Sequence, residues 1–148
     1  MKDYARNKKA YADYTISKSF EAGIVLTGNE VKSVRTGGID LTGAFVIIRG
    51  EEAYIVNATI APYQPQNIPE KYEKDRTLKL LMHKREITEI MGSLQQKGLT
   101  ILPLRMYNKG AKIKVEIAIA RGKRTYEKRE KIKKRETQRD IERTMKNL

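Results

Sequence analysis

The sequence of 148 residues contains no cysteine and only one histidine, His83. A chain without cysteine has no disulfide, no thiolate metal site and no cysteine nucleophile, and a single histidine does not build a metal site by itself. We therefore expect no metal and no disulfide framework. The absence of cysteine is also compatible with a reducing cytoplasm.

Long apolar segments are missing as well. No run approaches the 18 residues of a membrane-spanning helix, and the first residues lack the apolar region of a signal peptide. Hydrophobic residues make up 39% of the chain, so we expect that part of it does not enter a packed core. These features predict a cytoplasmic protein with one domain, for which 148 residues suffice.

The common catalytic patterns are absent from the sequence. There is no phosphate-cradling glycine loop, no HExxH motif and no tight cluster of aspartate and glutamate for two-metal chemistry. We therefore predict a binding protein rather than an enzyme, with no cofactor.

Positive charge is abundant and unevenly distributed. The net charge is +13, and residues 121–148 hold 12 cations and 5 acids, a net of +7. Such a basic segment predicts a polyanionic partner. An anionic membrane is the competing partner, but the segment lacks the Trp, Phe and Leu face of interfacial helices.

Few apolar residues occur in this basic segment, which we predict as a tail over residues 123–148. Opposite charges four residues apart, as in Glu127 with Lys131, favour a helix by only about 0.2–0.5 kcal/mol per pair. We expect a disordered or helical tail that is disordered alone and folds, at least partly, on RNA or the ribosome. A solubilising tail without a defined bound form is the alternative.

Residues 23–35 predict a strand end, a tight turn and a short helix. Asn29 is expected as the helix N-cap. The outer side of the helix would carry Glu30, Lys32, Ser33 and Arg35. These groups suit base amino groups, phosphates and 2′-hydroxyls of a folded RNA. From spacing alone, an ordinary solvated helix face is the more common interpretation.

Most of the remaining pattern is typical of β-strands. We predict strands over residues 14–26, 44–49, 53–60, 99–105 and 112–120, with a bulge or bend at Gly23. In residues 53–60, the alternation places Tyr54, Val56, Ala58 and Ile60 on one face. In the last strand, the apolar residues are Ile113, Val115, Ile117 and Ile119.

Two further segments have clear signals. Residues 83–96 predict an amphipathic helix whose stripe of Ile87, Ile90, Met91 and Leu94 packs as core over an open barrel end. Residues 61–74 contain three prolines and predict a loop.

The order of these elements predicts a mainly β protein with about two or three helices. We expect a basic extended arm over residues 1–12, a folded domain over residues 13–122 and the tail. A small closed antiparallel barrel of the OB type is one option among several.

Several motifs together resemble one family, namely NKKAYADY, EAGIVLTGNEVKSVRTG, APY, LLMHKREI, LPLRMYNKG and ARGKRTYEKRE. From about Asn7 to about Arg143, the sequence resembles the SsrA-binding protein family. This family is also called small protein B, the tmRNA-binding protein of bacterial trans-translation. The resemblance favours the OB-like barrel over the other options.

The resemblance implies binding to the tRNA-like domain of tmRNA and entry, with elongation factor Tu, into stalled ribosomes. It places the basic tail in the decoding centre of the small subunit and in the empty mRNA channel. A ribosomal or generic OB-fold RNA-binding protein is the alternative. An OB-fold nuclease, which would need an acidic metal pocket, is a further one.

The family motifs imply RNA contact by Asn7, Lys8, Lys9, Glu30, Lys32, Ser33, Arg35, Asn57, Tyr63, Arg76, Lys79, Lys123 and Arg124. They imply a ribosomal role for the tail residues Tyr126, Lys128, Arg129, Lys131, Lys133, Lys134 and Arg135. The sequence departs from the family pattern at Asn29, Thr59, Tyr72, Lys74 and Leu78. One arginine contact of the family is therefore expected to be missing in residues 72–79.

Overall fold

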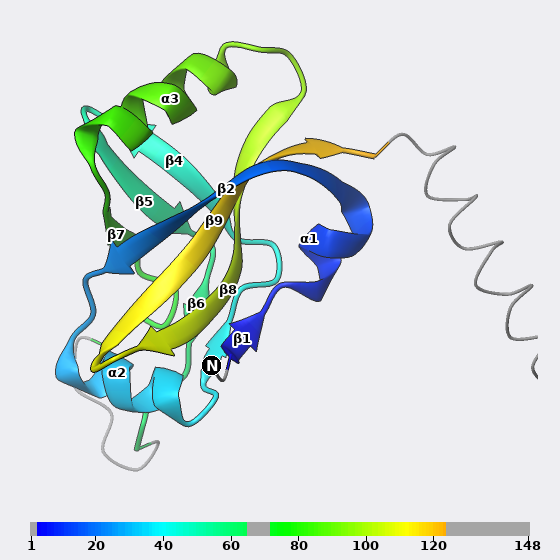
Figure 1. Ribbon diagram of the computed structural model, residues 1–148. Helices are drawn as coiled ribbons and strands as arrows, with labels where there is room; N and C mark the ends of the chain where they lie inside the picture. The colour runs from blue at the N-terminus through cyan, green and yellow to red at the C-terminus, as the bar shows by residue number, and fades with distance from the viewer. Residues whose placement is uncertain (1–2, 65–71, 124–148) are drawn as a thin grey trace, which may run out of the picture.

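The computed structural model describes residues 3–64 and 72–123, which form a curved β-sheet with three short helices (Figure 1). The predicted mainly β fold with a few helices is confirmed. The predicted tail contacts from Arg124 to Arg135 lie outside the described residues. Within those described ranges, none of the helices is both long and apolar enough to cross a membrane.

Seven strands form one antiparallel sheet in the order β1-β8-β9-β2-β7-β5-β4. They are β1 (Asp3–Arg6), β2 (Tyr14–Ile24), β4 (Phe45–Arg49), β5 (Glu52–Val56), β7 (Leu78–Leu81), β8 (Leu99–Lys109) and β9 (Lys112–Gly122). A small second sheet pairs β3 (Ile39–Asp40) with β6 (Thr59–Ile60). The helices are α1 (Lys8–Asp13), α2 (Gly28–Arg35) and α3 (Lys84–Leu94).

The alternation predicted for the last strand is confirmed in β9. Ile113, Val115, Ile117 and Ile119 are buried in the main core. Toward the end of β9, Ala118 and Ala120 are also buried, in a smaller apolar cluster that includes Ala10 of α1. Helix α1 therefore covers the second face of the sheet at this end, where small alanine side chains let it approach closely.

The predicted closed barrel is wrong. The sheet is open, with β1 and β4 as its two edges. Strand β4 comes near β8, yet no ladder joins them within residues 3–64 and 72–123. The amino-terminal segment occupies part of the edge of β8, since β1 pairs with Arg105–Tyr107 and Asn7 bonds the carbonyl oxygens of Pro103 and Leu104.

Within the segment 1–12, for which an extended arm was predicted, the described residues 3–12 form β1 and most of α1, so the extended conformation is wrong for them. Asn7 lies between them and is 2% exposed. Its Nδ2 donates to the carbonyl oxygen of Pro103 at 2.9 Å, and its Oδ1 accepts from the backbone N–H of Ala10 at 3.2 Å. Asn7 thus caps α1 and ties it to the sheet.

The predicted strand over residues 53–60 is divided at Asn57, which has a φ of +65°. Asparagine tolerates this left-handed conformation better than most residues. Before the kink Ala53 and Ile55 are buried, rather than Tyr54 and Val56, and after it Ala58 and Ile60 are buried. The kink therefore changes which alternate residues face the core.

Two other strand predictions need correction. The irregularity in β2 lies between Ile16 and Lys18 and not at Gly23. Strand β7 was not predicted, although it joins β2 to β5 within the sheet.

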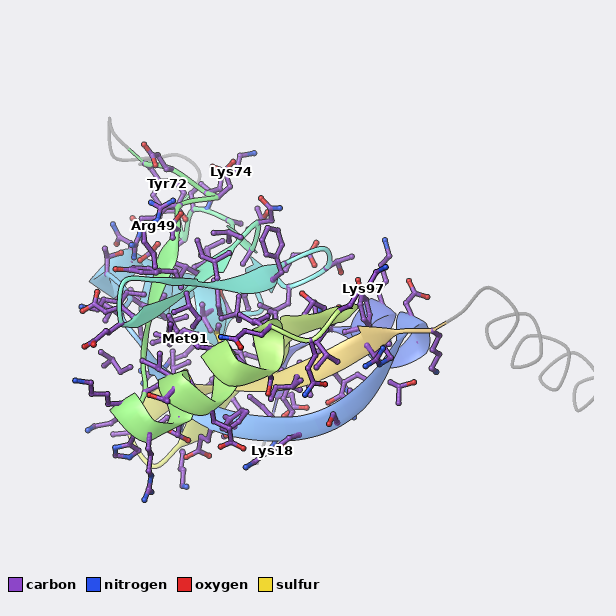
Figure 2. All side chains as sticks on the ribbon, turned by 90° about the horizontal axis from the view of Figure 1, so that it is seen from above. Lys18, Arg49, Tyr72, Lys74, Met91 and Lys97 are labelled. Carbon is purple, nitrogen blue, oxygen red and sulfur yellow. The ribbon has the colours of Figure 1, made fainter. Side chains whose placement is uncertain are left out.

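Helices α3 and α2 lie at opposite ends of the sheet (Figure 1). Ile87 and Ile90 of α3 are buried as predicted. Met91 and Leu94, by contrast, are 44% and 37% exposed, so the predicted core stripe is only half right. Figure 2 labels Met91 on α3.

Candidate nucleic-acid interface

Helix α2 begins at Gly28, and its N-cap is Thr27, not Asn29 as predicted. The backbone N–H of Glu30 donates to Thr27 Oγ1 at 3.2 Å, and the Thr27 N–H donates to Glu30 Oε1 at 2.8 Å. This reciprocal pair is a capping box. Its signal, threonine followed three residues later by glutamate, is present in the sequence and was missed.

Arg76 binds the Glu30 carboxylate with two nitrogens. Its Nε donates to Oε2 at 3.0 Å and its Nη2 donates to Oε1 at 2.5 Å. Arg76 also donates to the carbonyl oxygens of Val25 and Thr77, at 3.4 Å and 3.2 Å. The guanidinium therefore joins the end of β2, the start of α2 and the start of β7.

This environment keeps Glu30 ionised although its side chain is 3% exposed. Burial opposes the charge, but the hydrogen bonds from Arg76 and from the Thr27 N–H outweigh it and hold the pKa of Glu30 below its ordinary value. In return, the hydrogen bond to Glu30 raises the pKa of Arg76. A bidentate arginine–carboxylate pair of this kind fixes geometry as well as charge.

Ser33 is the second buried polar residue of α2. Its Oγ donates to the carbonyl oxygen of Ala61 at 2.5 Å. Beside it lies Gly38, on which a Cβ would be 2.2 Å from Ser33 Oγ. The Ala61 N–H also donates to the Gly38 carbonyl oxygen at 2.8 Å. These contacts hold the segment after β6 against α2.

Residues 72–76 are held against the same segment. Tyr72 Oη donates to the carbonyl oxygen of Ile60 at 2.5 Å, and the Ile60 N–H donates to the carbonyl oxygen of Lys74 at 2.7 Å. Figure 2 shows Tyr72 and Lys74 together at one end of the molecule. Tyr72, one of the departures from the family pattern, therefore has a structural partner here.

The exposed side of this assembly carries cations and an aromatic ring. Lys32 and Arg35 of α2 are exposed. The Lys32 Nζ lies 5.8 Å from the centre of the Tyr63 ring, and Tyr63 is 41% exposed. We call Lys32, Arg35, Tyr63 and Arg76 the α2 surface. A basic helix beside an exposed tyrosine can bind phosphates and stack on a base.

Three of the predicted RNA contacts point inward. Asn7, Glu30 and Ser33 are each 2–3% exposed, and each has hydrogen-bond partners in the protein. In this structure they are not available to an RNA, so we interpret them as residues that set the shape of the surface. The sequence pattern missed this because their partners are distant in the chain.

The other predicted contacts lie elsewhere. Lys8 and Lys9 are exposed on α1, and the Lys123 N–H donates to the Asp13 carbonyl oxygen at 2.9 Å, which places Lys123 next to the end of that helix. Asn57 is exposed at the kink between β5 and β6. Lys79 forms an ion pair with Glu52 at 3.1 Å on the sheet.

In the part of the chain that the structure describes, no three histidine, cysteine, aspartate or glutamate residues gather as a metal site would require. The buried carboxylate of α2 is engaged, since Glu30 is bound by Arg76.

The chain is similar over nearly its whole length to proteins of one family. Residues 4–147 match the family model described as SmpB protein. The chain is 52% identical over 144 residues to the SsrA-binding protein of a Sulfurihydrogenibium species, covering 96% of this chain and 93% of that protein. It is 51% identical over 143 residues to the SsrA-binding protein of Persephonella marina, covering 95% and 92%.

A solved structure is also similar. Its description reads "tmRNA-SmpB: a journey to the center of the bacterial ribosome". The TM-score is 0.68 at 42% identity, and the match covers 81% of this chain and 84% of that one.

Proposed function

The chain belongs to the SmpB family, and from this premise we propose that it binds tmRNA and delivers it to stalled ribosomes for trans-translation. As a member of this family it is a binding protein and not an enzyme. Its partners are tmRNA and the ribosome. Elongation factor Tu joins indirectly, through the aminoacylated tmRNA, and the process takes place in the cytoplasm.

The α2 surface is the observation that carries the RNA-binding part of this proposal. Lys32 and Arg35 face solvent, and no acid forms an ion pair with either within residues 3–64 and 72–123. Tyr63 adds an exposed ring beside Lys32. The cations can bind phosphates, and the exposed ring can stack on an unpaired base. A folded, tRNA-like RNA offers both features, whereas a uniform duplex offers no unpaired base.

We assign direct RNA contact to side chains that are exposed or half-buried, and to Arg124 outside the described residues, and we assign positioning to the buried side chains. Lys8, Lys9, Lys32, Arg35, Asn57, Tyr63, Lys79, Lys123 and Arg124 contact the RNA, with Arg76 partly exposed beside them. Asn7, Glu30 and Ser33 hold the backbone that presents these groups. The basic residues between Tyr126 and Arg135 enter the decoding centre and the vacant mRNA channel.

The double variant Lys32→Ala with Arg35→Ala tests the α2 surface. Removing a cation that binds one phosphate lowers the slope of log affinity against log salt by about 0.7–0.9. We expect about tenfold weaker binding to the tRNA-like domain of tmRNA and a slope lower by about 1.5. The control is Arg85→Ala with Lys97→Ala, which removes the same charge near α3, at the opposite end of the sheet.

Equal weakening in both variants would mean that only net charge matters. The generic RNA-binding alternative would then describe the protein better. That alternative also predicts no preference for the tRNA-like domain over an ordinary tRNA.

A further inference from the structure

The hairpin that joins β8 to β9 extends past the last residue pair between β9 and β2. That pair is Gly23 with Lys114, whereas β8 and β9 stay paired as far as Lys109 with Lys112. Beyond Lys114, strand β2 therefore no longer supports the hairpin through a backbone ladder. In Figure 1 the turn of the hairpin lies next to α2. Side chains must set its orientation there.

The turn touches the α2 surface through Arg35. The Nη2 of Arg35 donates to the carbonyl oxygen of Ala111 at 3.3 Å, and both residues are exposed. A guanidinium has five N–H donors, so it can bind this oxygen and an RNA phosphate at the same time. The position of the turn therefore influences where Arg35 presents its remaining donors.

Glu21 of β2 anchors this hairpin. One of its carboxylate oxygens accepts from the Tyr107 hydroxyl, and the other accepts from Lys109 Nζ at 3.0 Å. Both donors belong to β8, and β9 lies between β8 and β2, so the two bonds cross over β9. The hydrogen bonds from Tyr107 and Lys109 hold the pKa of Glu21 below its ordinary value. The anchor is thus an ionised carboxylate with two donors.

Tyr107 is the rigid part of the anchor. It is 2% exposed, and the guanidinium of Arg105 lies 4.1 Å from the centre of its ring. Arg105 is itself held by Asp3 of β1 at 2.9 Å and by Glu116 of β9 at 3.5 Å. Burial and the bond to Glu21 raise the pKa of Tyr107, so its hydroxyl remains a donor. Four strands therefore fix the point to which the carboxylate is bound.

We propose that Glu21 is a positioning residue for RNA binding. Through Tyr107 and Lys109 it fixes the hairpin, and the carbonyl oxygen of the turn in its place orients Arg35. Glu21 has no RNA contact of its own in this account, because its charge repels phosphates and both of its oxygens are bound within the protein. The inference rests on the proposed function, since it explains how the fold orients one of the RNA-binding cations.

The first test removes the hydroxyl of the anchor without changing any charge. Binding of the full-length chain to the tRNA-like domain of tmRNA is measured by fluorescence anisotropy in a salt series, at temperatures where each variant is folded by circular dichroism. We expect Tyr107→Phe to weaken binding about threefold and to lower the salt slope by up to about 0.8, although no cation has been removed.

Tyr54→Phe is the matched control for this variant. The Tyr54 hydroxyl also donates to a glutamate, Glu52, at 2.7 Å, but both residues belong to β5 and the bond does not hold the hairpin. We expect its affinity and salt slope to equal those of the wild type. Equal affinities and slopes for Tyr107→Phe and Tyr54→Phe would overturn the proposal.

The second test uses the sign of a charge effect. Glu21→Ala removes an acid, so electrostatics alone predicts tighter RNA binding, whereas loss of the anchor predicts weaker binding. Glu89→Ala is the control, because it removes a similarly exposed acid that is paired with Lys18 at the other end of the sheet. We expect weaker binding for Glu21→Ala only. Tighter binding of Glu21→Ala would contradict a positioning role.

The third test asks whether the anchor acts through Arg35. In an Arg35→Ala background, Tyr107→Phe should cause no further loss of affinity, since the group that it positions is absent. A merely structural effect of Tyr107→Phe would weaken binding by the same factor in both backgrounds, and that result would overturn the proposal.

These results are separable from a failure of the proposed function. If the wild-type chain does not prefer the tRNA-like domain over an ordinary tRNA, the proposed function fails. If it does prefer that domain, and the Tyr107 and Glu21 variants behave like their controls, only the positioning role fails.

Discussion

Arg76 and Glu30 are 46 residues apart in the sequence, yet the guanidinium grips the buried carboxylate through two nitrogens, at 3.0 Å and 2.5 Å. Glu30 also closes the capping box of α2 with Thr27. One carboxylate thus starts the helix and ties it to the segment that leads into β7. The exposed cations of α2 keep their positions because this buried pair fixes the backbone beneath them.

Removing either partner should destabilise the fold. Glu30→Gln retains a capping oxygen but removes the charge, so we expect a decrease of about 1–3 kcal/mol in the free energy of unfolding. Arg76→Ala leaves a buried carboxylate without its cation and should cost about 2–3 kcal/mol, less than a fully buried pair because Arg76 is 34% exposed. Urea unfolding of both variants and of the double variant gives the coupling directly. Additive effects would show that the two groups do not interact.

The contribution of Glu30 to the free energy of unfolding should depend on pH and should decrease toward low pH. The folded-state pKa of Glu30 is below the ordinary value of 4.5. Its stabilising effect is therefore complete above about pH 5 and disappears as the pH falls through the folded-state pKa. The stability difference between the wild type and Glu30→Gln should be constant from about pH 7 to about pH 5 and shrink below pH 4.5. A difference that grows toward low pH would contradict this pairing.

Gly38 should tolerate no side chain. A Cβ there would lie 2.2 Å from Ser33 Oγ and 3.0 Å from the Ser33 carbonyl oxygen. Gly38→Ala must therefore displace Ser33 and break its bond to Ala61, with an expected decrease of about 2–3 kcal/mol in the free energy of unfolding. Gly28→Ala is the matched control, because nothing lies within 4 Å of a Cβ at that position. This control should be neutral or gain up to about 1 kcal/mol.

The apolar residues of α3 should differ in how much they contribute to the free energy of unfolding. Ile90 is fully buried and Ile90→Ala should cost about 3 kcal/mol. Met91 is 44% exposed, so Met91→Ala should change the free energy of unfolding by less than about 1 kcal/mol. Thermal and urea unfolding of the two variants measure this. Equal costs would mean that Met91 packs as core, as the periodicity alone predicted.

Local pattern was enough for part of this fold. The period of two in β9 identified the face that enters the main core, because alternation directly reports one face of a strand. It did not predict that Ala118 and Ala120 on the opposite face are buried as well. The apolar stripe located α3 to within two residues at each end. In both cases the signal spans several consecutive residues and does not depend on distant partners.

The sequence pattern did not predict which side of α2 is buried. A helix of two turns with only two valines does not define which side is buried. Glu30, Ser33 and Val34 share the inner face because Arg76 and Ala61 lie against it, and those partners are distant in the chain. The family motif implied RNA contact at Glu30 and Ser33, whereas the structure shows both side chains buried and bonded to partners within the protein.

The sequence pattern also did not predict whether the sheet closes into a barrel, because closure depends on pairing between strands that are far apart in the sequence. Part of the edge of β8 is taken by the amino-terminal segment, since β1 pairs with Arg105–Tyr107. Asn7 takes the carbonyl oxygens of Pro103 and Leu104 there. No local signal in residues 45–49 carries this information.

The central claim is that the folded part, and not the basic tail, selects tmRNA. Fluorescence anisotropy would compare the full chain with a truncation after Lys123, using three probes: the tRNA-like domain of tmRNA, an ordinary tRNA and a DNA duplex. Across a salt series, the account predicts that both proteins prefer the tRNA-like domain. Equal binding to all three probes that disappears with the tail would contradict it, since the tail would then be the only binding element.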